Sequence, residues 1–318
     1  TMTFLLTGAA GFIGSSIAKS LLKLGHTVIG VDNLSIAVKD KTRAAGWQSL
    51  KNHPRFCPLR EDINSPSLHL LLEKAQQDYG QIQIALHFAA IPGVRNSHLR
   101  KNEYYQNNVE GTENLLTTLD FLNVQKLIFT SSSSVYGNSQ IPFSEQTEHS
   151  VLKPCSYYGQ TKLLGEGLVR HWTDEKKQAI VLRPFSVYGQ HMRPDLAIPI
   201  FIRALELGET VEVFGDGCSS RDYTHIDDLV RAIHLAINHF ASMQNRFQMV
   251  NIGTGKQTGI TELIELLAKY LNVTPSISFR QAKSEEMLAT QADISKAQNV
   301  FGFKSDITIQ NGLFEMIK

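Results

Sequence analysis

The stretch FLLTGAAGFIGSSIAKSLLKLGHTVIGVDN, residues 4–33, decides the fold of this chain. It starts with an apolar run, continues through glycines spaced G-x-x-G-x-x-G over Gly8–Gly14, and changes to a helical pattern before a second apolar run. Glycines at this spacing permit a tight turn and a close approach of the backbone to a pyrophosphate, and the following helix offers free N–H groups. The stretch predicts a strand, a phosphate-binding turn and a helix, although a plain glycine-rich turn is the alternative that the motif alone leaves open.

Asp32 ends the second apolar run, in Val28-Ile29-Gly30-Val31-Asp32-Asn33. A carboxylate at this place accepts hydrogen bonds from the hydroxyls of an adenosine ribose and repels a 2′-phosphate. No arginine follows directly, so NAD is favoured over NADP as the cofactor. Asp62, in Glu61-Asp62-Ile63, is a further candidate for the adenine end, and a plain surface aspartate is the competing interpretation.

Strand-like and helical patterns alternate over the first half of the chain. The apolar strand-like runs are Phe4–Leu6, Val28–Val31, Ile82–Phe88, Lys126–Thr130 and Ala179–Leu182. The helical stretches are Ile13–Leu24, Ser67–Tyr79, Glu103–Leu122 and Tyr158–Trp172. Such alternation predicts an α/β fold of the Rossmann type, a doubly wound parallel sheet with helices on both faces.

The second half is less regular and predicts a smaller C-terminal α/β lobe for the substrate. Its helical patterns are Pro199–Leu207, Asp227–Asn238 and Thr261–Leu271, and its short strand patterns are Val211–Phe214 and Met249–Asn251. We expect an NAD-binding domain over residues 1–182 and mainly a substrate lobe over residues 183–318, with some segments returning to the large sheet. No flexible linker marks the border.

Composition argues against several classes of partner. A formal net charge of +1 over 318 residues gives no reason to expect nucleic acid or an anionic membrane. The three cysteines lie far apart, so neither a disulfide framework nor a metal site is expected. The N-terminus runs straight into a strand pattern, and no apolar run reaches the roughly 18 residues of a membrane span. We therefore expect a cytoplasmic protein without a metal ion.

Tyr158 and Lys162 form a Y-x-x-x-K pattern at the start of a helical run. The four-residue spacing places both side chains on one helix face, where an ammonium group and a positive nicotinamide ring would together stabilise a phenolate. A tyrosine needs such help to act as a base near neutral pH. The serine run Ser131–Ser134 follows a buried strand at the carboxyl end of the sheet, where ligands bind in such folds. Alone, each feature is also compatible with an ordinary helix surface or a serine-rich loop.

Together these residues resemble the extended short-chain dehydrogenase/reductase superfamily, and specifically its NAD-dependent nucleotide-sugar epimerases. The resemblance covers nearly the whole chain. The segments that carry it are Gly8–Gly14, Asp32, His87–Ala90, Asn108–Thr112, Ser131–Gly137, Tyr158 with Lys162, Arg183–Gly189, Gly215–Gly217 and Arg221–Tyr223.

The resemblance implies a role for each matching residue. Tyr158 removes the proton of the sugar 4-hydroxyl while hydride leaves C4 for nicotinamide, Lys162 supports the phenolate, and Ser132 matches the catalytic Ser/Thr. Relatives form homodimers through the helices over Glu103–Leu122 and from Tyr158 onward, so a homodimer is expected. The implied cofactor contacts are Gly8, Gly11, Phe12, Ile13, Gly14, Asp32, Asn33, Asp62, Ile63, Ala89, Ala90, Asn108, Thr130, Tyr158 and Lys162.

The serine run also separates the expected reaction from a related one. Nucleotide-sugar 4,6-dehydratases typically carry Thr-Asp-Glu before Val-Tyr-Gly, and this chain has Ser133 and Ser134 at the acidic positions. A hydroxyl cannot replace a carboxylic acid in transferring that proton, so dehydration is disfavoured. A UDP-sugar 4-epimerase is the expected enzyme.

The segment Gln190–Asp195 resembles the x-R-P-D segment of UDP-glucuronate 4-epimerases, in which the arginine lies near the sugar carboxylate. UDP-glucuronate to UDP-galacturonate is therefore the favoured epimerisation, and Arg221 matches the arginine that binds the diphosphate. The implied substrate contacts are Arg95, Ser132, Ser133, Ser134, Ser186, Arg193 and Arg221.

Several alternatives stay open. Epimerases of UDP-glucose and UDP-N-acetylglucosamine carry similar segments, and Arg193 is equally suited to brace its loop through Asp195. Thr290 aligns with a gate position near the sugar, where a small residue admits a bulky 2-N-acetyl group. Decarboxylation of UDP-glucuronate is a related reaction, and a non-catalytic NAD-binding scaffold is the alternative from another class of protein.

Overall fold

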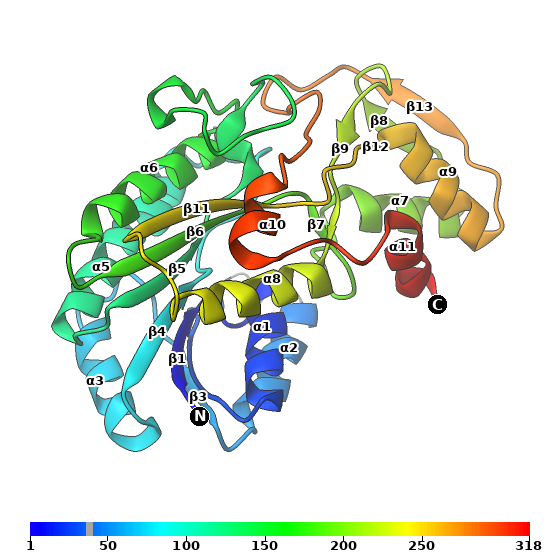
Figure 1. The fold of residues 1–318 in the computed structure, drawn as a ribbon. Coiled ribbons are helices and arrows are strands. Elements are labelled where there is room, and N and C mark those ends of the chain that lie inside the picture. Colours follow the sequence, from blue (N-terminus) through cyan, green and yellow to red (C-terminus); the bar gives the residue numbers. More distant parts are fainter. Residues whose placement is uncertain (36–40) are drawn as a thin grey trace.

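The computed structural model describes residues 1–35 and 41–318. A seven-stranded sheet in the order β11-β6-β5-β4-β1-β2-β3 forms its centre, and the strands pair in parallel (Figure 1). The strands are β1 (Thr3–Thr7), β2 (Thr27–Val31), β3 (Phe56–Leu59), β4 (Ile82–His87), β5 (Lys126–Thr130), β6 (Gln178–Pro184) and β11 (Phe247–Ile252). The predicted doubly wound α/β fold is confirmed.

Each strand divides its side chains between two cores, because successive side chains of a strand point to opposite faces of the sheet. Phe4 and Leu6 of β1 pack into one core and Leu5 into the other. The first core contains side chains of α1 (Phe12–Lys23), α2 (Lys41–Lys51) and α8 (Ile226–His239). The second contains side chains of α3 (Leu68–Tyr79), α5 (Gly111–Phe121) and α6 (Tyr157–Trp172). Burial of nearly unbroken apolar runs on both faces explains why the strands lack polar alternation.

The single helix predicted over Glu103–Leu122 is interrupted. The chain instead forms α4 (Lys101–Tyr105), a widened π-helical turn η1 (Gln106–Glu110) and then α5. A π turn adds a residue to the helix and often occurs at functional sites. Here it carries Asn108, whose amide bonds the backbone of Ile91. This long-range contact has no signature in the helical periodicity.

The second half forms a lobe beside the large sheet. A third core joins α7 (Ala197–Glu206), α9 (Ile260–Leu271) and α11 (Ile309–Ile317), which Figure 1 shows gathered away from the main sheet. Beside them, β8 (Val211–Phe214) pairs in parallel with β13 (Ile277–Arg280). The shorter elements are β7 (Val187–Tyr188), β9 (Ser220–Arg221), β10 (Thr224–His225), β12 (Thr258–Gly259), α10 (Ser295–Phe301), η2 (Ser133–Tyr136) and η3 (His149–Val151).

Late segments of the chain return to the large sheet. β11 lies at its edge beside β6, and α8 and α10 contribute side chains to the core that also contains α1. The lobe is therefore connected to the sheet through several segments rather than one linker. Among the described residues, no helix combines the length and apolar character needed to cross a membrane.

Candidate active site

A cavity of about 880 Å³ lies at the carboxyl ends of the strands, between the sheet and the lobe. Residues of both halves line it, from the Gly8–Gly14 turn to Arg221. The volume falls in the upper range of ligand-binding pockets, and the position is where open parallel sheets bind ligands.

The Gly8–Gly14 turn is packed tightly at the sheet end of the cavity. Gly8 has a φ of +74°, and a Cβ there would lie 2.7 Å from the backbone nitrogen of Ala89. A Cβ on Gly14 would lie 2.1 Å from the carbonyl oxygen of Gly8. Gly11 is the N-cap of α1 without a side-chain cap, so the first N–H groups of the helix are available to a phosphate.

Asp32 follows β2 directly and braces the same turn. Its Oδ2 accepts a hydrogen bond from the backbone N–H of Ala10 (2.9 Å), and its Oδ1 accepts one from Leu34 (2.9 Å). The carboxylate thereby lies at the cavity wall where a dinucleotide ribose is predicted.

Most of the other predicted cofactor contacts line the cavity with the turn. They are Phe12, Ile13, Asn33, Ile63, Ala89, Ala90 and Thr130. Thr130 is nearly buried, and its Oγ1 has no hydrogen-bond partner among the described residues, so this hydroxyl has a free capacity to meet a ligand.

Asp62 and Asn108 lie behind the cavity wall instead. Asp62 accepts a hydrogen bond from the Nδ2 of Asn33 (2.8 Å), and is not among the residues that line the cavity. Asn108 is buried, and its amide bonds both the N–H and the carbonyl of Ile91 (2.7 and 3.1 Å) and donates to Thr161 Oγ1 (3.0 Å). In this geometry, the two residues bond Asn33 and Ile91, which do line the cavity.

Tyr158 and Lys162 come from the first turns of α6, one helical turn apart on the same face. Ser156 caps this helix by accepting a hydrogen bond from the N–H of Gly159 (3.0 Å). The Nζ of Lys162 donates to the carbonyl of Thr130 at the end of β5 (2.8 Å). A Cβ on Gly159 would lie 2.6 Å from the carbonyl oxygen of Ser134, so glycine lets α6 approach the serine run closely.

Burial dominates the electrostatics of this pair. It raises the pKa of Tyr158 to about 12, while a hydrogen-bonding interaction with Ser132 and the positive charge of Arg193 favour the phenolate. Burial also lowers the pKa of Lys162 to about 8, against the opposing effect of Glu166. Lys162 thus stays protonated near neutral pH, and Tyr158 requires a further positive charge, such as a nicotinamide ring, to ionise there.

The serine run forms the wall beside Tyr158. The Oγ of Ser132 donates to the Oγ of Ser134 (3.1 Å) and accepts from the Ser134 N–H (3.1 Å). Ser133 and Ser186 also line the cavity. The structure therefore gathers hydroxyl groups from η2 and from the segment after β6 around one space.

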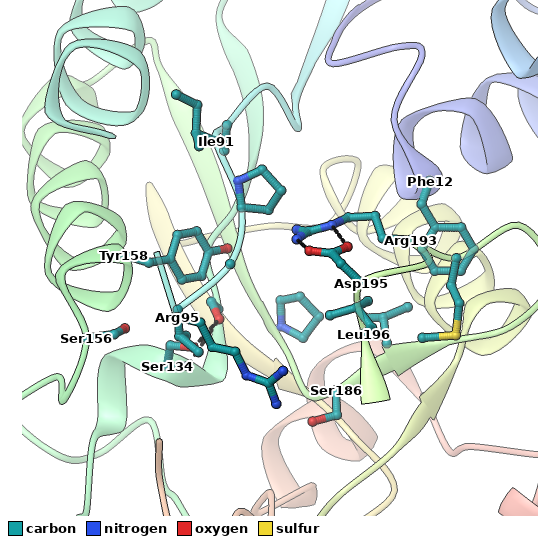
Figure 2. Close-up of a pocket in the computed structure, with 18 of the residues that line it drawn as sticks. Phe12, Ile91, Arg95, Ser134, Ser156, Tyr158, Ser186, Arg193, Asp195 and Leu196 are labelled. Carbon is teal, nitrogen blue, oxygen red and sulfur yellow. Dashed lines mark hydrogen bonds and ion pairs between the residues drawn. The ribbon is translucent and has the colours of Figure 1, made fainter. Parts of the chain in front are cut away.

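Arg193 faces this space across from Tyr158, and Figure 2 shows its side chain paired with Asp195. Its Nε donates to Asp195 Oδ1 at 2.9 Å, and a second contact joins Nη2 to Oδ2. The Arg193 side chain is 19% exposed and the Asp195 side chain 61%. Arg193 thus both braces its loop through Asp195 and lies at the cavity.

Arg95 and Arg221 lie toward the lobe. The Nε of Arg95 bonds Glu286 Oε1 (2.7 Å), which ties the loop after β4 to the segment after β13. The Nη1 of Arg221 donates to the carbonyl of Ser220 (2.8 Å), and burial lowers the pKa of this arginine. Both residues line the cavity, where an anionic group would compensate the burial of Arg221.

The structure differs from the sequence interpretation at two residues, one expected at the cavity wall and one overlooked. Thr290, expected at a gate near the sugar, is 1% exposed and does not line the cavity, because its Oγ1 accepts a hydrogen bond from the N–H of Asp222 (3.1 Å). Met287, three residues earlier, lines the wall instead. The sequence interpretation also missed Tyr104, whose hydroxyl bonds the carbonyls of Pro92 and Gly93 (3.0 and 2.9 Å); its four-residue spacing from Asn108 was the available signal.

Over residues 1–35 and 41–318, no group of three or more His, Cys, Asp or Glu side chains is placed to hold a metal ion.

Comparison with known proteins places the site in context. Residues 4–253 match the family described as the NAD dependent epimerase/dehydratase family. A UDP-glucuronate 4-epimerase of Thermodesulfobacterium geofontis is 33% identical, over 98% of this chain and 93% of that protein.

Solved structures are similar over nearly the full length. The UDP-glucuronic acid 4-epimerase of Bacillus cereus, in complex with UDP-glucuronic acid and NAD, has a TM-score of 0.89 and 33% identity, covering 99% of this chain and 98% of that one. The UDP-N-acetylglucosamine 4-epimerase of Methanobrevibacter ruminantium M1, in complex with UDP-N-acetylmuramic acid, has a TM-score of 0.85 and 27% identity, covering 99% and 96%.

Proposed function

The chain belongs to the NAD dependent epimerase/dehydratase family, and from this premise we propose that it is an NAD-dependent 4-epimerase of UDP-glucuronate. The family match, the relatives at 33% identity and the arrangement of Tyr158, Lys162 and Ser132 support this proposal. Residues 1–182 would hold the cofactor, and residues 183–318 would supply most of the contacts to the nucleotide sugar.

The residues at the sheet end of the cavity fit NAD. The tight glycine turn, the uncapped start of α1 and the carboxylate of Asp32 suit a pyrophosphate and a ribose, and the unpartnered Thr130 hydroxyl lies near the expected nicotinamide end. NAD bound by these residues would supply a reversible hydride acceptor for C4 of the sugar.

The chain's own residues carry the proton chemistry. Tyr158 takes the proton of the sugar 4-hydroxyl, and Ser132 shares the hydrogen bond to that oxygen. Lys162 keeps its charge below a pH of about 8 and lowers the energy of the Tyr158 phenolate. The resulting 4-keto sugar rotates in the cavity so that the opposite face of C4 would receive the hydride, and Tyr158 returns the proton to the 4-oxygen.

The observation that carries the choice of sugar is the position of Arg193 across the cavity from Tyr158, in the cavity that Ser132, Ser134 and Ser186 also line. A guanidinium group in a cavity with several hydroxyls is well suited to a sugar carboxylate, and Arg221 with Arg95 is suited to the diphosphate. The bond between Arg193 and Asp195 favours a second candidate, a neutral UDP-hexose or its 2-N-acetyl form, because the arginine is already partnered.

We also propose a cytoplasmic homodimer. The unpaired state of Cys57, Cys155 and Cys218 supports the reducing compartment. Phe121 on α5 and Leu164 on α6 are about half exposed, which supports an association through these helices. Sedimentation velocity tests the dimer, and a monomer at micromolar concentration would contradict it.

Proton NMR with UDP-glucuronate and NAD tests the function, with a Tyr158→Phe variant as control. Formation of UDP-galacturonate by the parent and not by the variant supports the epimerase and its base together. Release of carbon dioxide would instead identify a decarboxylase. Binding without turnover of any UDP-sugar would identify a scaffold, and turnover of neutral UDP-hexoses alone would support the second candidate.

A further inference from the structure

Three residues on one face of α6 contact three consecutive residues at the end of β5. Tyr158 interacts with Ser132, Lys162 donates to the carbonyl of Thr130 (2.8 Å), and Glu166 accepts a hydrogen bond from the Oγ of Ser131 (2.5 Å). The four-residue spacing of the helix members places them in one row. The third member, Glu166, transfers no proton in the chemistry described above and acts on it only by raising the pKa of Lys162.

The helix approaches this strand without space for adjustment. A Cβ on Gly165 would lie 2.7 Å from the ring of Phe129 in β5. This close packing fixes the distance between α6 and β5. Because Thr130, Ser131 and Ser132 are consecutive, any shift of the strand end would move all three relative to α6.

The carboxylate of Glu166 is buried and held in one orientation. Glu166 forms an ion pair with Arg183, and the two side chains are almost completely inaccessible, with 1% and 0% of their surface exposed. The Nε and Nη2 of Arg183 donate to the two carboxylate oxygens (2.8 and 2.7 Å), and Oε1 also accepts from Ser131. The guanidinium carbon of Arg183 lies 4.7 Å from the centre of the Tyr136 ring, and Nε2 of His149 lies 3.7 Å from Oε2.

A buried ion pair of this kind is weak support for stability, because desolvation offsets most of the attraction between its charges. Its geometry has a different consequence. Two hydrogen bonds from Arg183 fix the position of the carboxylate that accepts the hydrogen bond from Ser131. Ser131 in turn lies between Thr130 and Ser132, the two residues that contact Lys162 and Tyr158.

We propose that Glu166 is a positioning residue of the active site. Through Ser131 it holds the end of β5 so that Ser132 faces Tyr158 and the Thr130 carbonyl faces Lys162. Arg183 orients Glu166 for this purpose. The inference rests on the proposed function only in that Tyr158 and Lys162 act on the substrate.

The first test is a Ser131→Ala variant, which removes one hydroxyl and leaves every charge in place. We expect kcat to fall about five- to tenfold, as loss of one aligned hydrogen bond implies, with KM for the nucleotide sugar unchanged within twofold. The matched control is Ser139→Ala, because the Oγ of Ser139 bonds the carbonyl of Tyr136 in the same loop without contacting α6. This control should retain the parent's kcat.

A pH profile separates positioning from structural damage. With Ser132 displaced, the Tyr158 phenolate loses part of its stabilisation, so the acid limb of kcat should move to higher pH in Ser131→Ala. The charged or titratable groups that act on Tyr158 are Arg193 and Tyr104, and neither is altered. Partial unfolding would lower the amplitude of the profile and leave the limb where it is.

The second test replaces the ion pair in the variant Glu166→Met/Arg183→Met. It leaves no unpaired charge, and apolar residues of similar volume often maintain stability in place of a buried pair. We expect a folded protein by circular dichroism and a fall in kcat at least as large as that of Ser131→Ala, because loss of Glu166 also lowers the pKa of Lys162. We expect no further loss when the three changes are combined. If the double variant fails to fold, Ser131→Ala alone decides the question.

Ultraviolet titration of tyrosinate in the NAD-bound protein, with a Tyr158→Phe variant subtracted, gives a readout without turnover, because the positive nicotinamide ring favours the Tyr158 phenolate. We expect the titration of Tyr158 to move to higher pH in Ser131→Ala. An unchanged titration and an unchanged acid limb would overturn the proposal, as would losses from the ion pair and from Ser131 that simply add. If the parent does not convert UDP-glucuronate, only the proposed substrate is refuted. The same comparison of variants can then use any UDP-hexose that the parent converts, and the tyrosinate titration requires no sugar substrate.

Discussion

Replacement of Arg193 by methionine should lower kcat/KM for an acidic sugar nucleotide and leave that for a neutral one unchanged. A charge-assisted hydrogen bond contributes about 1.5–3 kcal/mol. In the present structure the bond must form in competition with Asp195, whose side chain is 61% exposed and loses about 0–1 kcal/mol when it returns to water. The net contribution of Arg193 to a sugar carboxylate is therefore about 0.5–3 kcal/mol, which corresponds to roughly 2- to 160-fold in kcat/KM.

The assay is kcat/KM for UDP-glucuronate and for UDP-glucose, measured for the parent and for Arg193→Met. The matched comparison is Arg221→Met, because both residues are arginines that line the same cavity. We expect Arg193→Met to affect UDP-glucuronate alone and Arg221→Met to weaken both substrates by a common factor through the diphosphate. An equal loss of both substrates in Arg193→Met would refute the carboxylate role and leave Arg193 as a brace for Asp195.

Further outcomes follow from the same structure. Activity should fall as the pH rises through about 8, where Lys162 loses its proton, and Lys162→Arg should move this alkaline limb upward because guanidinium keeps its proton; a pH profile of kcat/KM checks both. Gly14→Ala should raise the Kd for NAD by more than about tenfold, since the new Cβ would lie 2.1 Å from a carbonyl oxygen, whereas Gly167→Ala, with open space around it, should leave the Kd measured by calorimetry unchanged. Ile180→Ala in the buried centre of β6 should lower the free energy of unfolding by about 2–5 kcal/mol in urea, and the same change at the exposed Leu207 should cost less than about 0.5 kcal/mol.

Much of the fold could be predicted from the spacing of residues that are close along the chain. The G-x-x-G-x-x-G turn, the aspartate after the second strand and the alternation of strands and helices depend on residues that are close along the chain. Such patterns report directly on φ, ψ and side-chain direction. For this reason the α/β fold was predicted correctly, and the structure places Tyr158 and Lys162 on one helix face as expected; their catalytic roles stay predictions.

Contacts between distant segments were not accessible in this way. Arg95 and Glu286 are 191 residues apart, and Ser131 and Glu166 are 35 apart. The turn η1, which divides the predicted helix, likewise carries the Asn108 side chain that bonds Ile91. Each of these interactions depends on how already formed elements pack against one another, which helical or strand periodicity does not encode.

The sequence by itself determined the strand and helix order, the cofactor class and the row of residues on α6, because each depends on spacing within one element or one turn. Only the tertiary structure decided which partners those residues meet: that Arg193 pairs with Asp195 at the cavity, that Thr290 points into the interior, and that Glu166 reaches Ser131. The physical reason is that an isolated side chain has several partners of nearly equal energy, and the close packing of helix on sheet selects one.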